Sequence, residues 1–156
     1  MEKTNQWLAV VANLGVIAGI LFLAYEIQVN TNAVRSSTYA AYSQGIGAWT
    51  DFQAEHAGAL SAIRDSVRSR TDWDQLTAAQ QMLWTAYASK TFSIMEEQYL
   101  HHRAGALDDD VFQAKMRNSV NFILADDGLL AGWTNADWGL TEDFKNYMDT
   151  RLATGK

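Results

Sequence analysis

One short stretch of the sequence, residues 96–102 (EEQYLHH), gathers side chains that could bind a metal or move a proton. Glu97 and His101 are one turn apart, so a helix places them on one face. Metal sites in helical bundles use Glu-x-x-His on two helices, and zinc proteases use His-Glu-x-x-His, and neither motif occurs here. We interpret His101 and His102 as surface residues that the dipole of a helix C-terminus favours. A metal-dependent enzyme using Glu97 and His101 remains an alternative.

The rest of the sequence offers little to a catalytic site. Zero cysteines exclude disulfides, thiolate zinc sites and cysteine nucleophiles. The acidic run Asp108 to Asp110 is typical of a helix N-cap and first turn, where the helix dipole favours negative charge. Hydrolase elbows, phosphate loops and dinucleotide fingerprints are absent. The sequence therefore predicts no catalytic residue, no metal or other cofactor and no enzyme activity.

Composition indicates the fold class and excludes one class of partner. The chain has 12 Lys+Arg against 18 Asp+Glu, a net charge of -6. An acidic surface repels phosphate backbones and anionic headgroups, which argues against nucleic-acid binding. The 156 residues contain no proline, so long helices can run without a kink or a lost N–H donor. We expect an all-α fold with one domain and an anchor.

The anchor is predicted from Trp7 to Tyr25, which reads WLAVVANLGVIAGILFLAY. At about 1.5 Å per residue this helix covers roughly the ~30 Å hydrocarbon core of a membrane. Trp7 and Tyr25 are residue types that settle at the two headgroup levels. A buried core helix and a cleaved signal peptide are the alternatives, but the segment MEKTNQ before it contains a single Lys. We expect a membrane anchor at residues 1–30 and a helical extramembrane domain at residues 31–156.

Small residues follow one face of this helix and continue past the membrane. Gly15 and Gly19 form a GxxxG pair, which lets two membrane helices approach closely. No Gly or Pro interrupts the sequence between the span and Gly45, so we expect one helix from Trp7 to about Gln44, bent or ended by Gly45 and Gly47. The predicted association residues, called the small-residue face below, are Ala12, Gly15, Gly19, Glu26, Ala33, Ser37 and Ala40.

Most of the chain, including its aromatic C-terminal part, resembles an uncharacterised group of small bacterial proteins. These proteins begin with a hydrophobic helix that runs into an EIxxNT-like segment. The matching residues are 13–19 (NLGVIAG), then Glu26-Ile27-Gln28 with Asn30-Thr31, and the turn at residues 105–108 is similar too. The resemblance implies an anchor followed by helices, and it implies no activity.

Charge at the two ends of the span predicts its orientation. Lys3 and the terminal amine flank one end, whereas Arg35 is the first positive charge beyond the other. Positive charge near a span favours the cytoplasmic side. With the bacterial resemblance, this predicts a single-pass protein of the inner membrane whose C-terminal domain is periplasmic.

About four further helices are expected after the anchor. Leu60, Ile63 and Val67 mark a short helix by their spacing. Thr77 and Gln80 form a capping box for a long helix from Ala78 to Arg103, which Gly105 ends. Asp108 caps the next helix, and residues 126–128 (DDG) end it. The last helix begins at the Thr141 cap and buries an apolar line of four residues, Phe144, Tyr147, Met148 and Leu152.

Two tryptophans lie in the segment GWTNADWG, which has loop composition. Trp133 and Trp138 are either core residues or a partner-docking surface, because Trp is enriched at binding hot spots. We predict a membrane-anchored accessory or interaction protein, which associates with itself or with the helices of a larger membrane complex. This function requires no residue type that the chain lacks. A homo-oligomeric pore, with Asn13 and Glu26 lining an aqueous path, is the second alternative.

Overall fold

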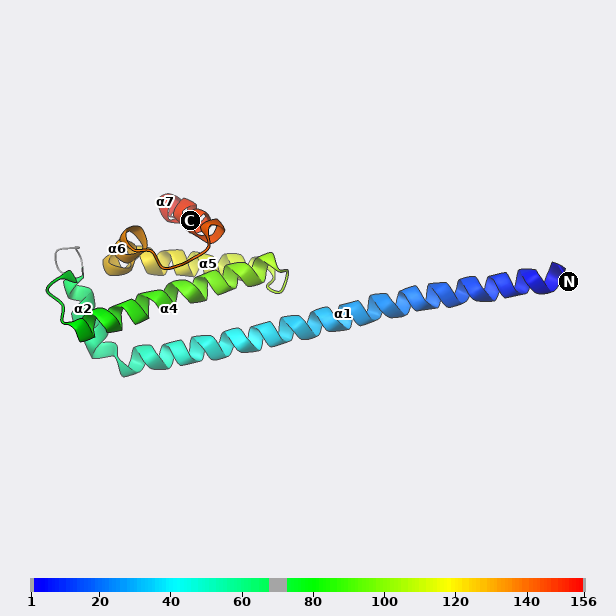
Figure 1. Cartoon of the computed structure of the whole chain (residues 1–156), viewed down its shortest axis with the longest axis horizontal. Coiled ribbons are helices and arrows are strands. Elements are labelled where there is room, and N and C mark those ends of the chain that lie inside the picture. Colours follow the sequence, from blue (N-terminus) through cyan, green and yellow to red (C-terminus); the bar gives the residue numbers. More distant parts are fainter. Residues whose placement is uncertain (1, 68–72, 156) are drawn as a thin grey trace. The chain divides into compact units, whose positions relative to one another are not determined.

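A computed structural model describes residues 2–67 and 73–155, without the side chains of residues 2–6, 9 and 65. The fold is 86% helical and has no strand in the described residues, which confirms the predicted all-α class (Figure 1). Contacts divide the chain into two compact units, Met1–Thr38 and Tyr39–Lys156. The described helices are α1 (Glu2–Glu55), α2 (Ala57–Ser66), α4 (Ala78–Arg103), α5 (Asp109–Leu124), α6 (Asp127–Asn135) and α7 (Glu142–Thr154).

Helix α1 is longer than expected. It continues through Gly45 and Gly47 to Glu55, so the prediction that these glycines bend or end it is wrong. A glycine inside a helix costs only about 1 kcal/mol relative to alanine, and neither residue has a positive φ. Beyond them, Trp49 and Phe52 pack against the hydrophobic core, which holds this end of the helix in place. Packing therefore outweighs the local preference of the two glycines.

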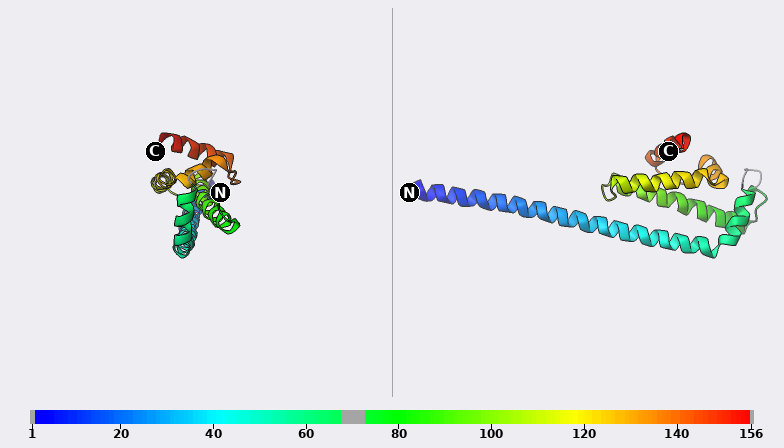
Figure 2. Two further views of the ribbon diagram at one scale, coloured as in Figure 1. Left: turned by 90° about the vertical axis from the view of Figure 1, so that its left-hand side faces the viewer. Right: turned by 180° about the vertical axis from the view of Figure 1, so that it is seen from behind.

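Helix α4 is the central helix of the second unit. It packs against α2 and α5, and α5 packs in turn against α6 and α7. Figures 1 and 2 show α4 and α5 side by side and antiparallel. Tyr87, Ala88 and Phe92 of α4 are fully buried, together with Phe112 and Met116 of α5. This arrangement explains why α4 has no single apolar face, since neighbours cover it on several sides.

The predicted helix starts are partly confirmed. Thr77 and Gln80 form the expected capping box, with the Gln80 N–H donating to the Thr77 Oγ1 at 3.3 Å and the Thr77 N–H donating to the Gln80 Oε1 at 2.9 Å. Asp108 and Thr141 stand at the N-cap positions of α5 and α7, but neither side chain makes a capping hydrogen bond. Gly105 follows α4 with a φ of 71°, a conformation that favours glycine.

Helix α6 is not among the helices predicted from the sequence. Asp126 does not lead α5 into a loop but caps α6, because its Oδ1 accepts hydrogen bonds from the Gly128 and Leu129 N–H groups at 3.0 and 3.1 Å. The first four residues of GWTNADWG are therefore helical, and the loop begins at Ala136. Five described helices follow α1, one more than the expected four.

Candidate functional site

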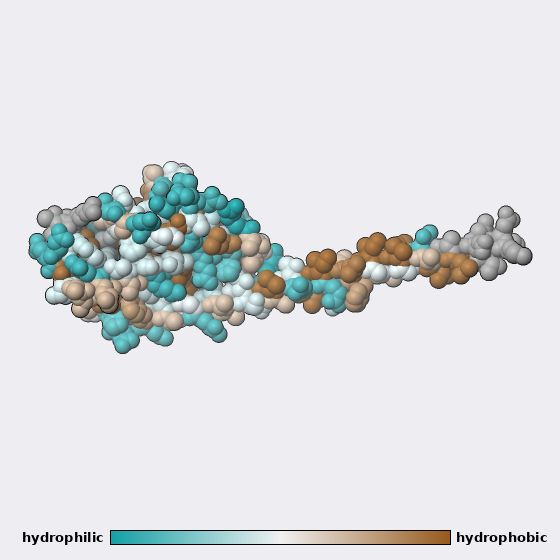
Figure 3. Space-filling model, in the orientation of Figure 1, coloured by the Kyte–Doolittle hydropathy of each residue, from teal (hydrophilic) through white to brown (hydrophobic). Residues whose placement is uncertain are grey.

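The described apolar side chains of the first unit are all exposed. Trp7 is 71% exposed, Ile17 is 53% exposed and Phe22 is 61% exposed. Figure 3 shows hydrophobic residues along this part of α1. One described helix is long and apolar enough to cross a membrane, over Val10–Glu55, and none of its most apolar window is buried in the protein.

The small-residue face is open along its length. Its seven residues are all exposed. A Cβ added at Gly15 or Gly19 would have no atom within 4 Å, so no described part of the chain occupies the GxxxG pair. The Ser37 hydroxyl donates to the Val34 carbonyl at 2.9 Å, so this polar group is satisfied within its own helix. The face can receive another helix without displacing any residue of this one.

Residues 96–102 tie helices together. His101 Nε2 lies 3.5 Å from Glu97 Oε1, and both side chains are partly exposed. His102 lies 3.1 Å from Asp109 Oδ1, and its ring stacks on Phe112 with centroids 4.0 Å apart. In the described residues, no group of three His, Cys, Asp or Glu side chains is placed to hold a metal ion.

Glu96 has a role that its sequence position does not reveal. Its Oε1 accepts hydrogen bonds from the backbone N–H and the hydroxyl of Thr141, at 2.7 and 2.8 Å. Thr141 immediately precedes α7, so a carboxylate from α4 satisfies the start of a helix 45 residues away. A second link joins the same two helices, because Arg103 donates to the carboxylate of Asp143. Glu96 and Arg103, which both lie in the C-terminal part of α4, thus fix the position of α7.

The two tryptophans of GWTNADWG have different environments. Trp133 is 8% exposed, its Nε1 donates to Asp149 Oδ1 at 2.7 Å, and its ring packs edge-on against Phe92 and Phe144. Trp133 is therefore a core residue, which agrees with the core alternative. Trp138 is only partly buried, and its Nε1 donates to the Gly132 carbonyl at 3.0 Å. A docking role stays open only for Trp138.

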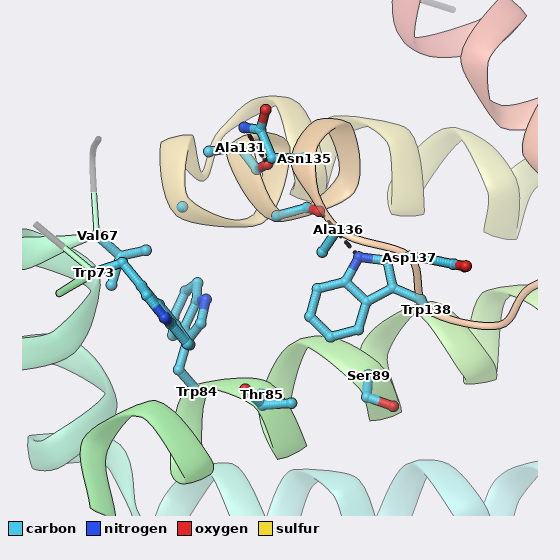
Figure 4. Close-up of a pocket in the computed structure, with 12 residues that line it drawn as sticks. Val67, Trp73, Trp84, Thr85, Ser89, Ala131, Asn135, Ala136, Asp137 and Trp138 are labelled. Carbon is cyan, nitrogen blue, oxygen red and sulfur yellow. Dashed lines mark hydrogen bonds between the residues drawn. The ribbon is translucent and has the colours of Figure 1, made fainter. Parts of the chain in front are cut away.

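Trp138 lines a cavity of about 500 Å³ that no sequence motif indicated (Figure 4). Thr85 and Ser89 of α4 form one wall. Small residues of α6 and the segment after it form another. The indole rings of Trp84 and Trp138 lie on either side of the gap. One feature of the sequence could have indicated this cavity. Small residues recur at Gly128, Ala131, Gly132 and Ala136, in the same segment as Trp133 and Trp138.

Two glycines in this wall predict opposite effects on stability. A Cβ at Gly128 would lie 2.9 Å from Trp84, whereas a Cβ at Gly132 would lie 3.5 Å from Trp138, which is ordinary contact. We expect Gly128→Ala to lower the free energy of unfolding by about 1–3 kcal/mol because the Trp84 ring must shift. Gly132→Ala is its matched control and is expected to raise it by about 0.4–1 kcal/mol, since alanine favours the helix. Urea unfolding followed by tryptophan fluorescence measures both, and equal effects would contradict the packing argument.

A polar cluster joins side chains of α2 and α4 with the residue that caps α6. Asp126 is 5% exposed, and its Oδ2 lies 2.8 Å from the Nε of Arg64 on α2. Tyr87 is 1% exposed nearby. Burial raises the pKa of Tyr87, with Arg64 opposing and Asp126 adding to the effect. Its phenol therefore keeps its proton across the physiological pH range.

Comparisons with known proteins add no relative. No family model, curated protein or solved structure matches the chain. The resemblance to the bacterial group with the EIxxNT-like segment therefore stays a prediction. What can be inferred about function depends on the exposed helix and the cavity.

Proposed function

We propose that the protein is a single-pass membrane protein that carries a small helical domain and acts as an accessory or interaction subunit. One observation supports this above all others, which is that every described apolar side chain of α1 from Trp7 to Val34 is exposed. At about 25 cal/mol per Å² of apolar surface, leaving so many large side chains in water is strongly unfavourable. The hydrocarbon core of a membrane surrounds such a helix on every side, and its thickness of about 30 Å matches about 20 apolar residues.

The small-residue face supports association within the membrane and just beyond it. Lipid tails are as apolar as leucine, so close packing between helix backbones drives association in a membrane, and small residues permit it. No atom lies within 4 Å of a Cβ added at Gly15 or Gly19, so the backbone of a second helix can come close there. Ala33, Ser37 and Ala40 continue the same exposed face past the span. Another membrane helix, either from a second copy of the chain or from a larger complex, fits against the small-residue face.

Single-cysteine cross-linking tests this proposal, since the chain has no cysteine of its own. At about 100° per residue, Ala33 lies on the same line as Gly15, whereas Thr31 lies on the opposite side of the helix. Both side chains are exposed in the structure. In native membranes, we expect oxidation of Ala33→Cys to give a disulfide dimer, or an adduct with another membrane protein if a cysteine lies opposite. Thr31→Cys is the matched control and is expected to give none.

Adding Gly15→Leu and Gly19→Leu to Ala33→Cys checks that the GxxxG pair drives the contact. The bulky side chains hold the backbones apart, so the cross-linked fraction is expected to fall about tenfold, which corresponds to about 1.4 kcal/mol. Cross-linking of equal extent from Ala33→Cys and Thr31→Cys would contradict the proposed face. The same result with and without the two leucines would also contradict it.

We further propose that the protein resides in a bacterial inner membrane with the helical domain in the periplasm. The support is Lys3 before the span and the bacterial resemblance of residues 13–31. Alkaline phosphatase, which is active only after export, is fused after Lys156, and a cytoplasmic reporter is fused at the same position in a second strain. We expect the phosphatase fusion to be active and the cytoplasmic reporter inactive, and the reverse pattern would contradict this orientation.

A further inference from the structure

The cavity of the helical domain has the dimensions of a small-molecule site. Its volume of about 500 Å³ falls within the range of roughly 300–1,000 Å³ that is usual for ligand pockets. Trp84 and Trp138 face the gap from two sides, and Trp73 also lines it (Figure 4). All of these residues belong to the second unit, so the cavity is contained within one compact part of the chain.

The chain itself holds both indole rings in place. The Nε1 of Trp138 donates to the Gly132 carbonyl at 3.0 Å. Trp84 is 2% exposed, and its six-membered ring lies against Gly128, so close that an added Cβ would come within 2.9 Å of it. Neither ring needs a ligand to fix its position. A site whose walls are already ordered pays less conformational entropy when a ligand binds.

Gly132 leaves space that core packing does not require. Its φ is not positive, and an added Cβ would meet only ordinary van der Waals contact with Trp138. Alanine would favour the helix more than glycine does, so neither the backbone nor the packing calls for glycine here. Its effect is to keep the wall of α6 back from the gap, as the small side chains of Ala131 and Ala136 also do.

The charge of the wall indicates the charge of the ligand. Asp137 is the one charged group among the described lining residues. Its Oδ1 accepts a hydrogen bond from the Gly139 N–H at 3.0 Å, and its carboxylate points away from the gap (Figure 4). An ionised ligand would lose its hydration there without gaining a charged partner, which is unfavourable. A neutral ligand carries no such cost.

The geometry points to a binding site for a neutral, largely apolar small molecule with a flat ring system, held against the partly exposed indole ring of Trp138, with the buried Trp84 closing the other side of the gap. Flat rings gain from stacked or edge-to-face contact with an indole, beyond the burial of apolar surface. A puckered molecule of the same size gains only the burial. This binding site is independent of the membrane association proposed above.

Two probes with one carbon skeleton test the inference, because 2-naphthol is flat whereas decahydro-2-naphthol is puckered. The full-length protein is labelled with 5-fluorotryptophan, placed in lipid nanodiscs and titrated with each probe by ¹⁹F NMR. We expect 2-naphthol to shift the Trp84 and Trp138 resonances saturably, with an affinity at least about tenfold above that of decahydro-2-naphthol. Trp133 lies in the core and is the internal control, whereas Trp7 reports probe dissolved in the bilayer.

Filling the cavity provides the matched variant. Gly132→Leu is expected to lower the affinity for 2-naphthol at least about tenfold, whereas Ala114→Leu, on an exposed position of α5, leaves it unchanged. If the Trp133 resonance shows that Gly132→Leu is misfolded, Gly132→Ala replaces it and is expected to weaken binding about threefold. Equal affinities for the two probes, or shifts of Trp84 and Trp138 that do not saturate, would overturn the inference.

Discussion

Replacing Leu14, Ile17 and Leu21 together by arginine is expected to move the protein from the membrane fraction to the soluble fraction. Each arginine near the centre of a span costs about 2.5–3.5 kcal/mol on the insertion scale, so three cost about 9 kcal/mol. That exceeds what the remaining apolar residues can supply, since each contributes only about 0.3–0.6 kcal/mol. The three side chains are exposed in the structure, so the change removes no contact within the described chain.

Alkaline carbonate extraction followed by sedimentation measures this effect. The wild-type chain is expected in the pellet, and the triple variant in the supernatant. Leu14→Ile, Ile17→Leu and Leu21→Ile together form the control, since they change the same positions and keep the hydrophobicity. A wild-type protein that carbonate extracts would contradict the anchor, and so would a triple-arginine variant that stays in the pellet.

Asp126→Ala is expected to cause the largest loss of stability in the helical domain, about 3 kcal/mol. Its Oδ1 is the acceptor for the first N–H groups of α6, and both Gly128 and Leu129 are buried. Loss of an N-cap costs about 0.5–2 kcal/mol, and each buried donor left unpaired costs about 1–3 kcal/mol. A loss of about 3 kcal/mol is a large part of the free energy of unfolding of a typical domain, which is about 5–15 kcal/mol.

Two further variants separate the cap from the ion pair. Arg64→Ala removes the partner of Asp126 on α2. Arg64 is 49% exposed, but the Asp126 carboxylate is 5% exposed and loses the partner of its Oδ2, so we expect a loss of about 1–2 kcal/mol. Asp126→Asn keeps the acceptor oxygen and is expected to lose about 1 kcal/mol. Urea unfolding of the full-length chain, followed by the fluorescence of the buried tryptophans, gives all three values. A loss for Arg64→Ala as large as that for Asp126→Ala would show that the ion pair is the main contribution.

The sequence by itself determined the features that depend on neighbouring residues. The Thr77 and Gln80 capping box and the bounds of α4 follow from residues within one turn of each other. The apolar span is equally local, because hydropathy summed over successive residues decides whether a helix can cross a membrane. These features do not depend on how the rest of the chain packs.

Only the tertiary structure decided the features that depend on distant residues. The continuation of α1 past Gly45 depends on the packing of Trp49 and Phe52, and α6 exists where composition alone indicated a loop. Glu96 meets Thr141 across 45 residues. The cavity depends on α6 lying opposite α4. The physical reason is that burial and long-range hydrogen bonds each outweigh a local preference of about 1 kcal/mol, and no local pattern records which distant residues will meet.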